Sequence, residues 1–288
     1  MNKSRKQALF GAAFILAGVT SIQTTSALVY PEFGPFSAGE VSAWRFLFGT
    51  MFLLVIARPK IRTWSKEQWR WVVIVGITTA LMNQFFYQSI SRIPLGGAVA
   101  IEYLGPFAVA VLGHRKPRQL LYVLCAGLGV LALTRPGSGL NALGITFAFL
   151  AAFMYAMYVL VTHKMGNLIQ GVEGLAMSMA VATVATSPFL FQSWGRMSHS
   201  GSLFWRLVFV AFLAIAMGFS FELQGIKRVR PATAGILFAL DPAMAFTAGL
   251  LFANQLVSGW DLIGCAFVVA AGIGATVDAA RSAPVLAQ

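Results

Sequence analysis

Residues 98–111 read AVAIEYLGPFAVAV, and Glu102 is the only charged side chain among them. Such an apolar run is typical of a helix inside a membrane. A charge at the centre of such a helix costs about 2.5 to 3.5 kcal/mol, so acids in that position usually face a cavity, a partner or a pathway. Glu102 is therefore a candidate functional residue, and the rest of the chain decides whether it stands alone.

The composition is that of an integral membrane protein. Of 288 residues 58% are hydrophobic and 10% charged, and the mean hydropathy is +0.76, whereas soluble domains carry roughly 25% charged residues. Apolar segments of about 20 residues cross a bilayer as helices, and they lack the alternation of barrel strands. We expect an all-α polytopic fold with ten spans, at residues 8–29, 38–57, 71–91, 94–113, 119–134, 142–162, 174–193, 203–224, 231–253 and 259–279.

The formal charge of +12 indicates membrane orientation, and we expect no nucleic-acid partner. With a cytoplasmic N-terminus, sixteen of the 21 Lys and Arg residues fall in inward-facing segments and four in outward-facing loops. This positive-inside bias predicts that both termini are cytoplasmic. The alternative, that residues 8–29 belong to a signal peptide, is disfavoured because the apolar run is longer than an h-region of about 7 to 15 residues.

The sequence offers little from which to build an enzyme. Cys125 and Cys265 both fall within spans and are expected to pack as small apolar residues. The three histidines have no ligand spacing, and we find neither a phosphate-binding Gly-rich loop nor a nucleophile elbow. We therefore expect no catalytic residues, no metal and no cofactor.

An internal repeat links the two halves of the chain. Residues 90–94 read ISRIP and residues 226–231 read IKRVRP, and Pro106 and Pro242 lie at the same offset of 136 residues as the Ile-x-Arg pairs. A fixed offset of this kind indicates two copies of one structural unit.

The second copy is expected to enter the membrane in the opposite direction. Five spans per copy is an odd number, and the charge count places Arg92 outside and Arg228 inside. We predict two inverted five-helix units, residues 1–136 and 137–288. In transporters of this kind the substrate site lies near the midplane, where the repeats meet.

Corresponding helix breaks mark where that site is expected. Gly105 with Pro106 and Asp241 with Pro242 interrupt the fourth and ninth spans. A proline inside a helix removes an amide donor and leaves a carbonyl that needs another partner, such as water or a polar substrate. The alternative is that each proline only kinks its helix for packing.

Three acids and one base within spans are the candidates, and the other charged residues fall in loops or at span edges. Glu102 and Asp241 both fall near the midplane, in corresponding helices, and the pair is expected to flank one central cavity. Arg45 is the natural counter-charge, either in a structural ion pair or as the partner of a substrate carboxylate. Glu222 is the third acid, and the alternative for it is contact with the cytoplasmic interface.

Further polar residues within the spans are candidates for the same site. They are Gln23 in the first helix and Asn83 and Tyr87 in the third. The alternative is that such groups only tie helices together, at about 0.6 kcal/mol each. The glycine pairs at 127–129 and 272–274 are expected to form packing or homodimer surfaces.

Several motifs resemble the drug/metabolite transporter superfamily, its EamA-type members and, most of all, the bacterial inner-membrane threonine and homoserine exporters. They are Ser21-Ile-Gln23, Arg45 with Gly49-Thr50, Met82-Asn83, Phe86-Tyr87, Ser89-Ile90, Pro94-Leu-Gly96, Ala98-Val-Ala100, Glu102, Gly105-Pro106 and Glu222. The likeness runs from the first to the tenth helix. One departure is Asp241, where the exporters have glutamate, and the shorter acid keeps the charge but alters the cavity.

The resemblance implies secondary-active export of small neutral amino acids across a bacterial inner membrane, with protons as the exchanged partner. Within transport, the alternative is another cargo of the same fold: an aromatic amino acid, a purine or a cationic toxicant. A membrane-embedded enzyme and a non-transporting scaffold are the alternatives outside transport.

Overall fold

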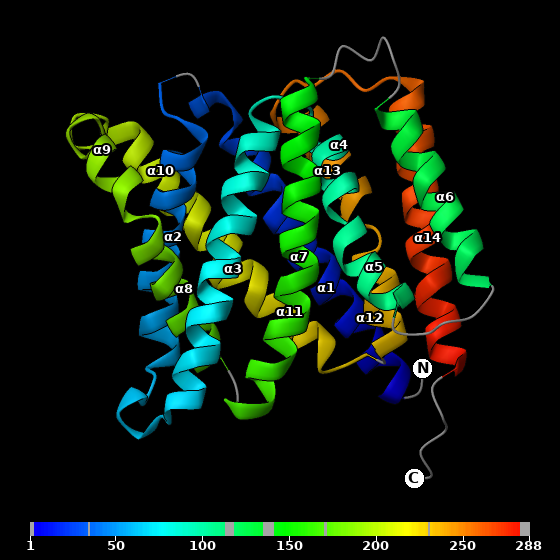
Figure 1. Ribbon diagram of the computed structural model, residues 1–288, viewed down its shortest axis with the longest axis horizontal. Helices are drawn as coiled ribbons and strands as arrows, with labels where there is room; N and C mark the ends of the chain where they lie inside the picture. The colour runs from blue at the N-terminus through cyan, green and yellow to red at the C-terminus, as the bar shows by residue number, and fades with distance from the viewer. Residues whose placement is uncertain are drawn as a thin grey trace.

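The computed structural model describes residues 3–33, 35–112, 118–134, 141–169, 172–229 and 231–282, and every regular element within these ranges is helical (Figure 1). The longer helices of the first half are α1 Lys3–Leu28, α2 Ala38–Ala57, α3 Lys66–Ile90, α4 Leu95–Glu102, α5 Leu104–Leu112 and α6 Arg118–Leu133. Those of the second are α7 Ala142–Leu168, α8 Glu173–Ala185, α9 Ser187–Ser198, α10 Gly201–Ala211, α11 Ser220–Ile226, α12 Pro231–Phe238, α13 Asp241–Phe252 and α14 Gly259–Ser282. Three short elements are η1 Tyr30–Phe33, η2 Ile61–Thr63 and the π-helix η3 Phe212–Phe219.

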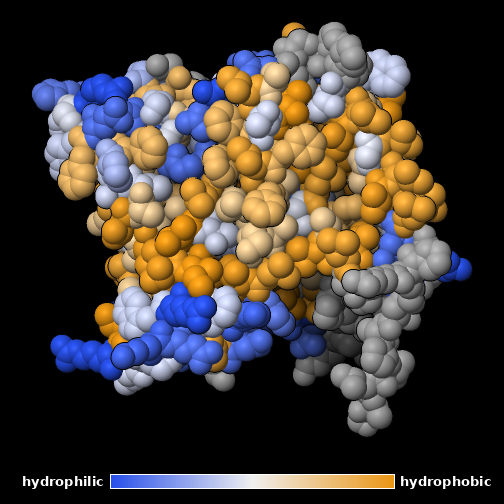
Figure 2. All heavy atoms as spheres, in the orientation of Figure 1, coloured by the Kyte–Doolittle hydropathy of each residue, from blue (hydrophilic) through white to orange (hydrophobic). Residues whose placement is uncertain are grey.

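The surface has the pattern of a membrane protein. Figure 2 shows a band of apolar side chains across the middle of the molecule, with hydrophilic side chains along its upper and lower edges. In the described part of the chain six helical segments are long and apolar enough to cross a membrane, or seven if the bent pair α8 and α9 counts as one span. Residues 95–109 and 118–133 form shorter apolar helices. The helical membrane fold is thus confirmed, and the count of ten spans stays a prediction.

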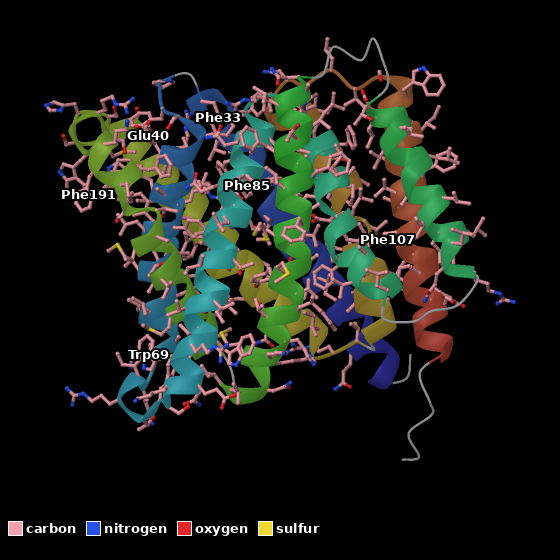
Figure 3. All side chains as sticks on the ribbon, viewed as in Figure 1. Phe33, Glu40, Trp69, Phe85, Phe107 and Phe191 are labelled. Carbon is pink, nitrogen blue, oxygen red and sulfur yellow. The ribbon has the colours of Figure 1, made fainter. Side chains whose placement is uncertain are left out.

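Hydroxyl, carboxylate and amide side chains decide where α2 and α3 begin. The Ser37 side chain accepts from the amide of Glu40, whose carboxylate accepts from the amide of Ser37, and Ser65 and Gln68 form the same reciprocal cap on α3. Each cap satisfies amide donors that have no partner inside the helix. Glu40 lies at the upper end of the bundle and Trp69 at the lower end (Figure 3), so α2 and α3 run in opposite directions.

Two of the predicted spans are interrupted at equivalent places. The fourth is divided at Tyr103 into α4 and α5, and the ninth is divided between Phe238 and Asp241 into α12 and α13. Pro106 has no amide hydrogen for the carbonyl four residues earlier, and neither has Pro242. Both prolines lie in the first turn of the following helix, where a missing donor is tolerated.

Two further spans depart from straight α-helices. The predicted span 174–193 bends by 71° between α8 and α9, where Pro188 begins the second helix. The predicted span 203–224 contains the π-helix η3, and the Ser21 hydroxyl of α1 donates to the carbonyl of Leu213 over 2.8 Å. π-Helical turns are rare and often lie at functional sites.

The terminal helices α6 and α14 pack closely along their length (Figure 1). A Cβ atom at Gly129 would lie 2.8 Å from the carbonyl oxygen of Gly264, so glycine allows the two backbones to approach. Gly272 and Gly274 pack against tyrosines of the first half. Both cysteines are free, and the Cys125 thiol donates to the carbonyl of Phe267 at 3.3 Å.

Candidate functional site

A cavity of about 200 Å³ lies among helices from both halves of the chain. All seven residues that the sequence marks as candidate ligands line its wall: Gln23, Arg45, Asn83, Tyr87, Glu102, Glu222 and Asp241. They come from α1, α2, α3, α4, α11 and α13. Polar residues distant in sequence therefore share one space. The helix-break residues Gly105, Pro106 and Pro242 do not line it, but they follow the lining residues Glu102 and Asp241 within four positions in the chain.

Arg45 projects from α2 into this wall, with no ionic partner among the described residues. Its guanidinium carbon lies 5.2 Å from the centre of the Tyr87 ring, a cation–π contact, and its Nε atom is buried without a hydrogen bond. An ion pair joins Glu40 and Arg196 at the upper end of the bundle. No ion pair between Arg45 and a carboxylate is found in the described part of the chain, and the role of Arg45 stays a prediction.

Asp241 is held by a contact between the two halves. The Nε2 atom of Gln23 in α1 donates to its Oδ1 atom over 2.6 Å. Asp241 is also the first residue of α13, where the positive end of the helix dipole favours a negative charge. Both contacts stabilise the ionised form of this carboxylate.

Glu102 is the last residue of α4, directly before the break at Tyr103. Its carboxyl group lines the cavity and has no hydrogen-bond partner in the part of the chain that the structure describes. Pro106 has no amide hydrogen to donate to the backbone carbonyl of Glu102. The side chain and the carbonyl of Glu102 thus both supply acceptors at the break.

Glu222 enters the cavity from α11, where α1 comes close. A Cβ atom at Gly18 of α1 would lie 2.7 Å from the Glu222 Cγ atom, so the glycine leaves room for the acid. The π-helix η3 precedes α11, and its residues Ala214 and Ile215 also line the cavity. The structure therefore places Glu222 in the cavity wall.

Several lining residues escaped the sequence reasoning. Ser42 lies three residues before Arg45, Thr79 four before Asn83, and Tyr155 and Tyr158 lie three apart on α7. Residues three or four apart share a helix face, so spacing from known candidates was a signal for Ser42 and Thr79. The α7 tyrosines have no such neighbour.

Aromatic and amide contacts lie at the upper end of the bundle. Phe33 packs edge-on against Tyr87, with ring centres 6.0 Å apart, and lies near the top in Figure 3. Gln255, in the loop after α13, accepts from the amide of Leu95 over 2.9 Å. Burial raises the pKa of Tyr30, and its hydrogen bond with Gln255 opposes that rise. These contacts join the loops of both halves.

Comparison with known proteins identifies the family. The sequence model of the EamA-like transporter family matches this chain twice, over residues 7–135 and 142–276. The chain belongs to the EamA-like transporter family. It is thus a transporter and a multi-pass membrane protein, and not an enzyme. The two matched stretches fall within the predicted units 1–136 and 137–288, whose inverted relation stays a prediction.

This EamA-like transporter has curated relatives along nearly its whole length. It is 29% identical to the "Threonine/homoserine exporter RhtA" of Salmonella typhimurium (strain LT2), over 93% of this chain and 91% of the relative. It is 28% identical to the protein of the same name in Escherichia coli (strain K12), over 94% and 92%. A protein of known crystal structure, 19% identical, shares the fold with a TM-score of 0.61 over 93% of this chain and 98% of its own.

Proposed function

We propose that this EamA-like transporter exports small neutral amino acids of the threonine and homoserine class in exchange for protons. One observation carries the proposal: a single buried cavity brings Arg45 together with three carboxylates, none of which is paired with it among the described residues. A zwitterion needs both signs of charge in one small space. The relatives named as threonine/homoserine exporters support the same cargo.

The volume of the cavity favours a small substrate. At about 200 Å³ it is smaller than the pockets of roughly 300 to 1,000 Å³ that hold drug-sized ligands. In our proposal the substrate carboxylate binds Arg45 and its ammonium group binds Asp241, which Gln23 and the start of α13 hold in the ionised form. An amino acid then spans the cavity from α2 to α13.

We assign proton exchange to Glu102. This carboxyl group faces the cavity without a hydrogen-bond partner in the described residues, and withdrawal from water favours its neutral form. It takes up a proton while the cavity opens outward and releases it while the cavity opens inward, where substrate then binds. The two states alternate, so the proton gradient drives export.

The broken helices supply moving parts for this alternation. α4 and α12 each end where α5 and α13 begin, so each half-helix is free to tilt without unwinding its partner. In the proposed orientation both chain termini are cytoplasmic and the upper end of Figure 1 faces outward. The breaks lie beside the cavity, and tilting there changes access to the bound substrate directly.

Uptake of radiolabelled threonine into inverted membrane vesicles tests the proposal. Export in the cell corresponds to uptake into such vesicles, and an imposed proton gradient should accelerate it only when the chain is present. The Arg45→Gln variant should lose uptake by roughly 100-fold, because the substrate carboxylate then has no charged partner. The matched control is Arg92→Gln, an exposed arginine outside the cavity wall that hydrogen-bonds with Gln88 and Ser91 and packs over the Phe147 ring. Uptake that is unaffected by Arg45→Gln would contradict the proposal.

A second cargo class, cationic toxicants, is favoured by the charge balance of the wall. Three acids face a single arginine, and such a surplus of negative charge also attracts an organic cation. Cells that overproduce the protein separate the two classes. Resistance to homoserine and threonine analogues supports the amino-acid exporter, whereas resistance to lipophilic cations alone supports the alternative.

A further inference from the structure

The wall formed by α2 and α3 holds three hydrogen-bond donors without acceptors. They are the Ser42 hydroxyl, the Arg45 Nε–H and the Tyr87 hydroxyl, and each is buried and without a partner in the described ranges. All three side chains line the cavity. Buried donors are normally paired, so three unpaired ones in the wall of one cavity require an explanation.

These three donors lie close together. Ser42 and Arg45 are three residues apart on α2 and so share a face of that helix. The Arg45 guanidinium carbon lies 5.2 Å from the centre of the Tyr87 ring. A carboxylate offers two oxygen atoms with about four acceptor positions, enough for all three donors at once.

Another part of the cavity wall, on α1, holds the opposite kind of group. Gln23 is 4% exposed, and its Nε2 atom is committed to Asp241, which leaves its Oε1 atom buried without a donor. An ammonium group carries three donors and no acceptor. It can bind the ionised carboxylate of Asp241 and the Gln23 oxygen together.

We propose that Ser42 and Tyr87 complete a carboxylate subsite around Arg45, and that Gln23 completes an ammonium subsite with Asp241. The unpaired atoms are donors on one wall and an acceptor on the other, so they match a zwitterionic α-amino acid in one orientation only. The inference rests on the proposed function and adds to it the residues that recognise each end of the substrate.

Competition binding with two analogues tests the assignment. Radiolabelled threonine bound to the purified full chain is displaced by threonine itself, by threoninamide, which lacks the carboxylate charge, or by 3-hydroxybutyrate, which lacks the ammonium group. Ser42→Ala and Tyr87→Phe should each lower the affinity for threonine by about tenfold, and the affinity for threoninamide should stay within about twofold of the wild type. Gln23→Leu should lower the affinities for threonine and threoninamide by about fivefold each and leave the affinity for 3-hydroxybutyrate unchanged.

Ser89→Ala is the matched control. Ser89 also has a buried hydroxyl without a partner, but it lies outside the cavity wall. This variant should bind all three ligands as the wild type does. Its thermal unfolding also reports what the loss of a buried serine hydroxyl does to the fold alone.

Two results would overturn the inference, and they are distinguishable. If Ser42→Ala and Tyr87→Phe lower the affinities for threonine and threoninamide by the same factor, the two hydroxyls do not bind the carboxylate. The proposed function still stands in that case. If the folded wild type binds no amino acid, the proposed function fails and the subsites fail with it. A loss of affinity for threonine, with the affinity for threoninamide kept, supports both the proposed function and the subsites.

Discussion

The two broken helices share one backbone device but differ in the chemistry placed on it. In the first half, Glu102 ends α4 and has no hydrogen-bond partner among the described residues. In the second half, Asp241 begins α13 and is tethered by Gln23. At the offset of 136 residues, Phe238 occupies the place of Glu102, and Asp241 the place of Gly105. The acids are thus not equivalent copies of one another.

This difference teaches how a repeated scaffold acquires two functions. A carboxylate tethered by an amide and by a helix N-terminus is suited to hold a cationic group as a fixed anion. A carboxyl group without such contacts is suited to gain and lose a proton. We infer that the second break binds the substrate and that the first couples it to protons.

Substitution at the glycine of the first break should have the largest effect. A Cβ atom at Gly105 would lie 2.1 Å from the backbone oxygen of Ala152 in α7, and no side-chain movement can relieve that contact. Gly105→Ala should therefore destabilise the protein by about 3 kcal/mol or more, measured by thermal unfolding in detergent. The comparison is Asp241→Ala at the equivalent position, which already holds a side chain and should lose only the stability of its hydrogen bond with Gln23, about 1 kcal/mol.

Neutralising the tethered acid should have the next largest effect. Asp241→Asn keeps the size of the side chain and removes its charge, so the substrate ammonium loses its ionic partner. The KM for threonine should rise about 30-fold, corresponding to about 2 kcal/mol. Vesicle uptake over a range of threonine concentrations measures it, with Asp261→Asn, which removes a helix-capping carboxylate outside the cavity, as control. An unchanged KM would show that Asp241 does not hold the substrate.

Removal of each proline tests whether the breaks act as equivalents. Pro106→Ala and Pro242→Ala return an amide hydrogen to the carbonyls of Glu102 and Phe238, which favours a continuous helix. Each change should slow transport about tenfold, which corresponds to about 1.4 kcal/mol in the barrier, with little change in threonine affinity. A loss at one proline only would show that a single break moves.

Release of the tether should have the smallest effect. Gln23→Leu removes the hydrogen bond to Asp241 and makes the second break resemble the first. Stability should fall by about 1 kcal/mol, read as a lower unfolding temperature, together with the fivefold loss of threonine affinity already described. Ile22→Leu, a neighbouring substitution in the same cavity wall, should leave stability unchanged. A more stable Gln23→Leu protein would contradict a stabilising tether.

Much of the site could be predicted from sequence because charge inside a membrane span is costly. Glu102, Asp241 and Arg45 stand out in apolar helices, and the prolines mark the two breaks. The structure gathers these acids and the arginine around one cavity.

Other features lacked a local signal. The hydrogen bond between Gln23 and Asp241 joins residues 218 positions apart, and it depends on tertiary packing. Tyr155 and Tyr158 line the cavity from α7, a helix on which the sequence marks no candidate site residue. The π-helix before Glu222 likewise consists of ordinary apolar residues.

The most direct test of the division between the two breaks compares two transport modes in proteoliposomes containing Glu102→Gln. Threonine exchange for threonine needs no net proton movement, whereas gradient-driven threonine transport does. We expect the variant to keep exchange near the wild-type rate and to lose gradient-driven transport by at least about tenfold, while Asp241→Asn weakens both modes. Gradient-driven transport that persists in Glu102→Gln would contradict the assignment of the proton to Glu102.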